Sequence, residues 1–120
     1  MNIRKRGETF ALLLAAHLKD TVKKAGFTQR KLAEATHTSA AQINMYLNAD
    51  RVLPVDFYSS ICTAINHDPA EIVDRAYQDL LDLEAGKRLD PRIMPIWKLA
   101  AKNPGYSIED QLKGEEDNQP

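Results

Sequence analysis

Apolar residues recur along most of this chain at the three- and four-residue spacing that is typical of amphipathic helices. The first apolar stripe repeats every four residues and consists of Phe10, Leu14, Leu18 and Val22. This stripe predicts a helix over residues 9–24. No segment shows the clean alternation of apolar and polar residues that a half-buried strand requires, so we expect an all-α protein.

Start signals divide the rest of the chain into further helices. Thr28 and Ser39 are preferred N-cap residues, because a hydroxyl can accept a backbone N–H that has no partner within the helix. Asp68 followed by Pro69 is a strong helix start, and Pro54 suits the first turn of a helix. The further predicted helices cover residues 28–36, 39–49, 54–66, 69–84 and 91–102.

The N-terminal residues 1–8 precede the first apolar stripe and are expected to form a flexible basic arm. Its three consecutive cations are Arg4, Lys5 and Arg6. A basic arm of this kind can reach into a groove of DNA, as the arms of homeodomains do. The alternative is a solubilising terminus with no binding role.

The C-terminal part divides into a helical extension over residues 76–113 and a polar, acidic tail over 114–120, which we expect to be disordered. The extension either covers the core or mediates dimerisation. Trp97 suits both roles, since aromatic residues are also enriched at interfaces. The acidic residues that we expect to form a solvated face of the extension are Asp79, Asp82 and Glu84.

Charge is distributed unevenly along the 120 residues. Residues 1–60 hold 9 Lys and Arg against 5 Asp and Glu, a balance of +4, and residues 61–120 hold 7 against 12, a balance of −5; together they give the net charge of −1. Phosphate binding needs local positive charge and not a basic protein as a whole. The N-terminal half is therefore the better candidate for binding a polyanion.

Several classes of protein are disfavoured by what the chain lacks. Cys62 is the single cysteine, so no intramolecular disulfide forms, and no stretch approaches the roughly 20 apolar residues of a membrane span. No secretory signal is recognisable, and we expect a cytoplasmic protein. The three histidines have no metal-ligand spacing, and no catalytic constellation is present, so we expect no metal, no cofactor and no enzymatic activity.

Residues 28–51 carry the most specific pattern, two short helices joined by a tight turn. Leu32 and Ala33 are the apolar residues of the first helix, and Ser39 with Gln42 forms a Ser-x-x-Gln capping box at the start of the second. The face of the second helix predicted to be buried consists of Ile43, Tyr46 and Leu47. The opposite face consists of Ala40, Ala41, Asn44, Met45 and Asn48.

This pattern resembles the helix-turn-helix of the lambda-repressor/Cro-type (XRE-like) transcription factors. The resemblance rests on Thr28, Gln29, Leu32, Ala33, Ser39, Ile43 and Asn48. It extends over residues 9–75 and implies a five-helix lambda-repressor-like domain, with an additional C-terminal helix. His37 stands where the family usually has glycine, so we expect a left-handed backbone there, which histidine adopts at some cost.

The resemblance implies that the helix over residues 39–49 enters the major groove of double-stranded DNA. The residues assigned to base reading are Ala40, Ala41, Gln42, Asn44 and Met45. Asn44 can bond bidentately to adenine, and alanine or methionine can contact a thymine methyl group. The two alanines replace the longer polar side chains usual in the family, so they either contact methyl groups or act only as helix formers. Gln42 either reads a base or serves the capping box.

Phosphate contacts are assigned to residues around the turn and after the second helix, and they carry no sequence information themselves. These residues are Gln29, Arg30, Thr38, Ser39, Asn48 and Arg51. The position of Gln29 binds a phosphate in the family. For each of these side chains the alternative is an ordinary solvated residue.

The sequence therefore predicts a sequence-specific transcriptional regulator, a repressor similar to small phage immunity repressors, associated with the nucleoid. Homodimerisation through the C-terminal helices is an open possibility. The alternative is an antitoxin or another protein-interaction module that uses this fold and binds a partner through its acidic C-terminal half.

Overall fold

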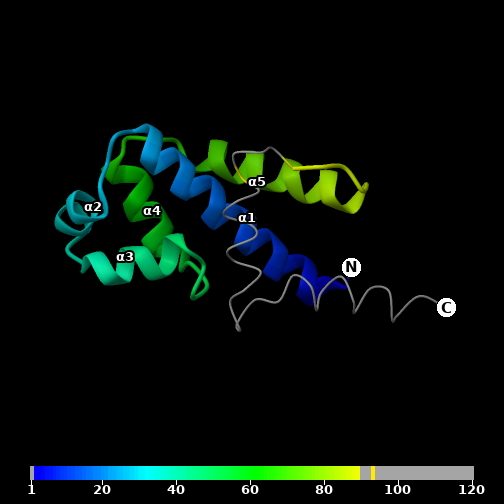
Figure 1. The fold of residues 1–120 in the computed structure, drawn as a ribbon, viewed down its shortest axis with the longest axis horizontal. Coiled ribbons are helices and arrows are strands. Elements are labelled where there is room, and N and C mark those ends of the chain that lie inside the picture. Colours follow the sequence, from blue (N-terminus) through cyan, green and yellow to red (C-terminus); the bar gives the residue numbers. More distant parts are fainter. Residues whose placement is uncertain (1, 90–92, 94–120) are drawn as a thin grey trace.

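The computed structural model describes residues 2–89 and Ile93 (Figure 1). These residues form five helices and no strand: α1 (Ile3–Lys24), α2 (Gln29–Thr36), α3 (Ala40–Leu47), α4 (Val55–Ala64) and α5 (Pro69–Glu84). The all-α prediction and the five predicted helices up to Glu84 are confirmed. The helix predicted over 91–102 with Trp97 and the tail over 114–120 lie outside the described residues.

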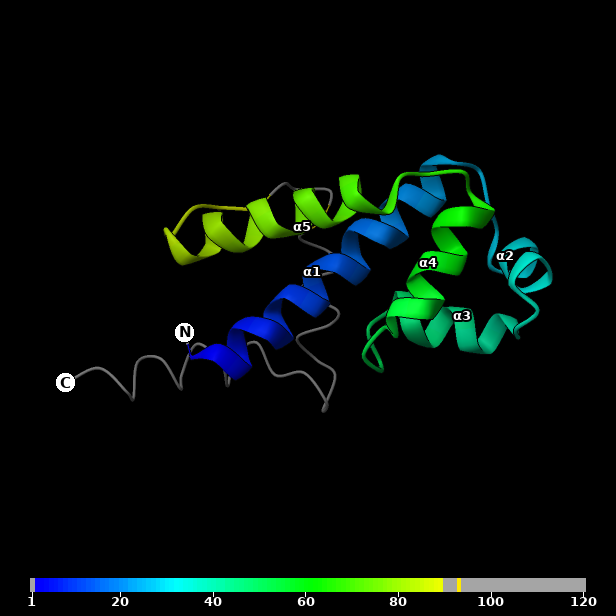
Figure 2. The ribbon, with the colours of Figure 1, turned by 180° about the vertical axis from the view of Figure 1, so that it is seen from behind.

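α1 is the longest helix and the one around which the others are arranged (Figures 1 and 2). α2, α3 and α4 gather around its C-terminal half, and α5 returns along it in the opposite direction. The side-chain pairs between the two helices follow this antiparallel order. Arg6 pairs with Glu84 near one end, and Thr21 accepts a hydrogen bond from Arg75 near the other.

The start of α1 differs from the prediction, because residues 3–8 of the expected flexible arm are helical. Asn2 is the N-cap, and its side-chain oxygen accepts the backbone N–H of Lys5 at 2.8 Å. Thr9, predicted as the first helical residue, is instead buried on the second turn, and its hydroxyl donates to the carbonyl of Lys5 at 2.8 Å. The Asn2 cap and the contact of Arg6 with Glu84 both stabilise the part of the helix that precedes the apolar stripe.

Two hydrophobic clusters hold the helices together. The domain cluster joins α1 to α2, α3, α4 and the start of α5, with Leu18, Leu32, Ile43, Leu47, Ile61 and Ile72 as its most buried large side chains. The α1–α5 cluster contains Leu12, Leu13, Ala15, Ala49, Ala76, Leu80 and Leu89. Leu14 packs against both clusters, so α1 connects them into one structure.

The two clusters confirm most of the predicted apolar stripes. Leu18 and Val22 of α1 are buried, as are Ile72, Ala76 and Leu80 of α5. None of the helices formed by residues 2–89 combines the length and the apolar character that a membrane crossing requires.

Candidate nucleic-acid interface

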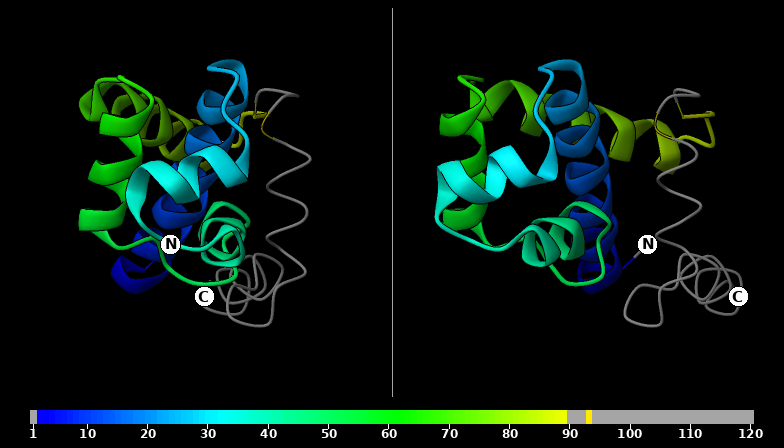
Figure 3. Two further views of the ribbon diagram at one scale, coloured as in Figure 1. Left: turned by 90° about the vertical axis from the view of Figure 1, so that its left-hand side faces the viewer. Right: turned by 60° about the vertical axis from the view of Figure 1, so that its left-hand side comes forward.

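Two N-caps and a left-handed residue, all predicted from the sequence, define α2, α3 and the turn between them. Thr28 Oγ1 accepts the backbone N–H of Lys31 at 3.1 Å, and Ser39 Oγ accepts that of Gln42 at 3.1 Å. His37 ends α2 in the left-handed region, with φ 55° and ψ 43°. The two capped helices are thereby fixed at a sharp turn, with α2 lying above α3 in both views of Figure 3.

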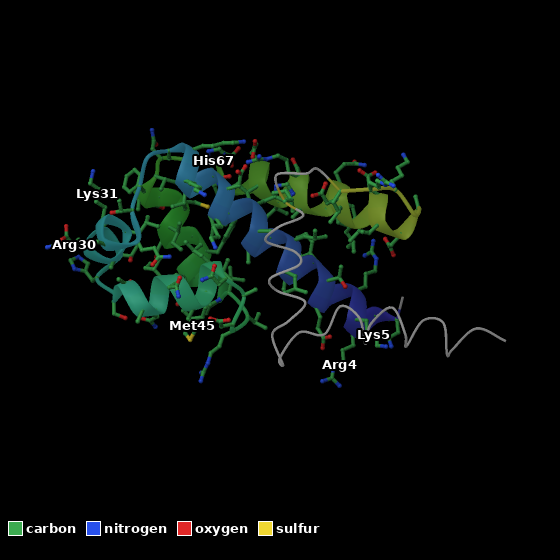
Figure 4. All side chains as sticks on the ribbon, in the orientation of Figure 1. Arg4, Lys5, Arg30, Lys31, Met45 and His67 are labelled. Carbon is green, nitrogen blue, oxygen red and sulfur yellow. The ribbon has the colours of Figure 1, made fainter. Side chains whose placement is uncertain are left out.

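The side chains of α3 divide as predicted into a buried and an exposed face. Ile43 and Leu47 are fully buried against the domain cluster, and Tyr46 is half-buried and contacts the ring of Phe57 at 4.6 Å between ring centroids. The exposed residues are Ala40, Ala41, Gln42 and Asn44, and Met45 is half-buried beside them. Figure 4 shows Met45 on the outer side of α3, away from the other helices.

The residues assigned to phosphate contacts lie at the start of α2, at the turn before α3 and directly after α3. Ser39, Arg30 and Arg51 are exposed, and Arg30 lies 3.7 Å from Glu34 in a solvated ion pair. Thr38 is half-buried, and its hydroxyl is 2.9 Å from that of Thr36. The other two residues assigned to phosphate contacts, Gln29 and Asn48, form hydrogen bonds with side chains of other helices that the sequence did not predict.

Three amide side chains and one ammonium group form a continuous set of hydrogen bonds across the interface, here called the Lys19 network. Lys19 of α1 donates to Asn48 Oδ1, and Asn48 Nδ2 donates to Asn44 Oδ1 at 2.7 Å. Gln29 Nε2, at the start of α2, also donates to Asn44 Oδ1, at 2.9 Å. The network thus links α1, α2 and α3 through the exposed face of α3.

Lys19 is a residue of this surface that sequence reasoning missed. It lies 29 positions before Asn48, and no local motif connects the two. Burial lowers the pKa of Lys19, and Lys23 nearby acts in the same direction, while Asp50 opposes them. A partly buried ammonium group of this kind needs a fixed acceptor, which Asn48 provides.

The three predicted arm residues lie on the first two turns of α1, and they do not share one environment. Arg4 is exposed and forms an ion pair with Glu8 at 3.3 Å, and Figure 4 shows Arg4 and Lys5 at the N-terminal end of α1. Arg6 instead donates to both carboxylate oxygens of Glu84, at 3.0 and 3.1 Å, and lies over the ring of Tyr77. Arg6 therefore joins α1 to α5 and is not a free cation that reaches a groove.

The acidic residues of α5 are not a uniformly solvated face, and this expectation is corrected for two of the three. Asp79 lies 2.6 Å from Nε2 of the buried His17, and Glu84 pairs with Arg6. The hydrogen bond from Arg6 lowers the pKa of Glu84. Among the residues that the structure describes, no three of His, Cys, Asp or Glu are grouped so that they hold a metal ion.

Comparison with known proteins identifies a family of domains. The sequence pattern of the helix-turn-helix domain matches residues 13–74, which is more than half of the 120 residues and spans α2, the turn and α3. No curated protein and no solved structure matches the chain significantly. The match coincides with the capped turn and the exposed face of α3 described above, and the chain belongs to the helix-turn-helix domain family.

Proposed function

We propose that this protein is a sequence-specific regulator of transcription that binds double-stranded DNA with α3 in the major groove. The observation that carries the proposal is the exposed face of α3, which presents small and amide side chains directly after a capped turn. The major groove of B-DNA is about 12 Å wide and admits one α-helix. Short side chains allow the helix backbone to approach the bases closely.

Positive charge near α3 supports the proposal that this helix faces the DNA. Arg30 on α2 and Arg51 after α3 are both exposed, so that they can neutralise phosphates. Ser39 and Thr38 at the turn supply hydroxyl groups at the start of α3. Contacts of this kind would position the protein, whereas Ala40, Ala41, Gln42, Asn44 and Met45 would face the bases.

We further propose that binding represses transcription by occupying a promoter, as the resemblance to small phage immunity repressors implies. A homodimer formed through the C-terminal part of the chain would bind two half-sites about 34 Å apart, one turn of the DNA helix. This arrangement rests on the resemblance, and the oligomeric state in solution and on DNA tests it directly.

Binding of the purified protein to its own upstream DNA and to scrambled DNA, measured over a salt series, tests the proposal. We expect a preference of about 10³-fold or more for the upstream DNA, and an affinity that falls steeply with salt. Equal and weak binding to both would contradict sequence-specific recognition. A search for a protein partner of the acidic C-terminal half would then be the next experiment.

The base-reading role of Asn44 has its own test. Asn44→Ala should relax the preference at one base pair, at a cost of roughly 1–3 kcal/mol for the best sequence and little for the others. The matched control is Gln78→Ala, which removes an exposed amide from α5, remote from α3. If Asn44→Ala weakens binding to all sequences equally, Asn44 contacts the backbone and does not read a base.

A further inference from the structure

The direction of every hydrogen bond in the Lys19 network is determined by its first member. An ammonium group has three donors and no acceptor, so the atom of Asn48 that faces Lys19 must be its oxygen, Oδ1. The amide nitrogen of Asn48 then faces Asn44, and the atom that accepts from it must be Asn44 Oδ1. Gln29 also approaches this oxygen and therefore presents its nitrogen. Lys19 thus orients three amides that are otherwise free to rotate by 180°.

The orientation leaves Asn44 with an unequal capacity for further bonds. An amide oxygen has two lone pairs, and both are used by the donors from Gln29 and Asn48. Its nitrogen, Nδ2, makes no hydrogen bond to any residue in the described part of the chain, and the side chain is exposed. Asn44 therefore presents a donor, and not an acceptor, to a molecule that approaches α3.

We infer that Lys19 is a positioning residue that makes Asn44 a donor-only reader of the base pair it contacts. This inference rests on the proposed function and refines it. Bidentate recognition of adenine needs Asn to accept from N6 and donate to N7 at once, and the acceptor is occupied. The chemistry selected is a base that presents an acceptor without a competing donor, which is guanine through N7 and O6, or thymine through O4.

The neighbours of Asn44 on α3 are compatible with either base. Ala40 and Ala41 lie one turn earlier on the exposed face, and Met45 is adjacent. Their apolar surfaces suit the methyl group of thymine, and their small size also leaves room for guanine. The identity of the selected base in the experiment below distinguishes the two.

Selection from a pool of random double-stranded DNA by the full-length protein tests the inference. The enriched sequences of the wild type are compared with those of Lys19→Met, which removes the ammonium group but keeps most of the side-chain volume. Lys23→Met is the matched control, because it removes the same charge from an exposed position one turn along α1. We expect the wild type to prefer guanine or thymine over adenine by about tenfold at one position, and Lys19→Met to reduce this ratio to about threefold or less.

A second variant reverses the polarity of the network instead of removing it. In Asn48→Asp the carboxylate can only accept, so Asn44 must rotate and donate to it. The Asn44 oxygen then faces the DNA and should favour a base with an exocyclic amino group, cytosine or adenine, at the same position. The added negative charge weakens binding to every sequence alike, and a comparison of enriched bases is not affected by it.

The outcomes separate this inference from the proposed function. If the wild type enriches no sequence, the proposed function is wrong, and the inference fails with it. If the wild type enriches a site and Lys19→Met and Asn48→Asp enrich the same bases, the function stands and the positioning role is overturned. A uniform loss of affinity in Lys19→Met, with a shallower salt dependence and unchanged bases, would also overturn it and would identify Lys19 as a phosphate contact.

A measurement on the free protein supplies a readout independent of DNA. The side-chain amide resonances of Gln29, Asn44 and Asn48 should move in the ¹H–¹⁵N spectrum of Lys19→Met and stay in place in Lys23→Met. Unchanged amide resonances in Lys19→Met would show that the network does not depend on Lys19 and would overturn the inference.

Discussion

At the scale of single residues, buried polar groups connect helices that are far apart in the sequence. His17 of α1 is 6% exposed, and its Nε2 lies 2.6 Å from a carboxylate oxygen of Asp79, 62 positions later. An ionised carboxylate only accepts, so the imidazole donates in this pair. The other ring nitrogen, Nδ1, is buried without a hydrogen-bond partner among the described residues. Asp79 is therefore the partner of one of the two ring nitrogens, Nε2.

Removing Asp79 should destabilise the fold. Asp79→Ala leaves a buried donor unpaired, and we expect the free energy of unfolding to fall by about 1–3 kcal/mol. Asp79→Asn keeps an acceptor at the same place and should lose less. Asp74→Ala removes a carboxylate from an exposed position of the same helix and is the control. Urea denaturation of the four proteins measures the differences, and equal midpoints for Asp79→Ala and Asp74→Ala would show that the buried pair does not stabilise the fold.

At the scale of elements, the sharp turn between α2 and α3 depends on one unusual backbone conformation. His37 has a φ of 55°, and left-handed geometry costs roughly 1–2 kcal/mol for a residue with a Cβ atom. The backbone N–H groups of His37 and Thr38 both donate to the carbonyl of Ala33, which closes the end of α2. The left-handed conformation of His37 is thus fixed by backbone hydrogen bonds, which glycine at this position can form equally well.

Replacing His37 with glycine should stabilise the protein. Glycine removes the steric cost but adds freedom to the unfolded chain, so we expect a net gain of up to about 1 kcal/mol in His37→Gly. His37→Val should be destabilising, because a β-branched residue tolerates positive φ poorly. Ala35→Gly, within the exposed part of α2, should cost about 1 kcal/mol and shows the ordinary effect of glycine in a helix. Thermal unfolding of the three variants distinguishes these effects, and a loss of stability in His37→Gly would contradict the assigned strain.

The elements that the sequence predicted correctly are those with local signals. Thr28, Ser39 and Asp68 act as N-caps because capping involves only neighbouring residues, and a local pattern reveals it. The start of α1 was missed because residues 3–7 carry no apolar stripe, and Asn2 was not recognised as a cap. The first turns of α1 are stabilised by the contact of Arg6 with Glu84, which lies 78 positions later in the sequence.

In the candidate site, too, the features with local sequence signals were predicted and those that depend on tertiary contacts were not. The exposed and buried faces of α3 follow from helical spacing, and both were predicted. The Lys19 network was not, because it joins residues of three helices that tertiary packing brings together. The sequence identified which side chains face outward, and only the structure shows which of their atoms are already occupied.

At the scale of the whole molecule, α5 extends the helix-turn-helix domain along α1. It packs against the N-terminal half of α1. The α1–α5 cluster provides the apolar part of this contact, and Arg6 with Glu84 closes its far end. The pKa of Glu84 is lowered by the hydrogen bond from Arg6, below the ordinary value of 4.5. A carboxyl group whose pKa is lowered in the folded state contributes stability above its unfolded pKa. That contribution is lost as the pH falls through the folded pKa.

The contribution of this pair should therefore depend on pH. At pH 7 we expect Glu84→Gln to unfold at a slightly lower urea concentration than the wild type, since the pair is exposed and screened by solvent. The difference should shrink as the pH falls below 4.5 and the wild-type carboxyl group is protonated. Glu34→Gln, which removes a carboxylate from an exposed position of α2, is the control. A difference that stays constant from pH 7 to pH 3 would show that the ion pair is not its source.

The contribution of α1 to both clusters has a consequence for the synthesis of the protein. The ribosome synthesises α1 first, but the carboxylate that meets His17 is added 62 residues later. At a translation rate of about 5–20 residues per second, about 3–12 s separate the synthesis of His17 from that of Asp79. The last buried residue of the domain cluster is Ile72, which is synthesised before Asp79. Until α5 has been synthesised, the apolar side chains of α1 that will pack against it remain accessible to chaperones and to other nascent chains.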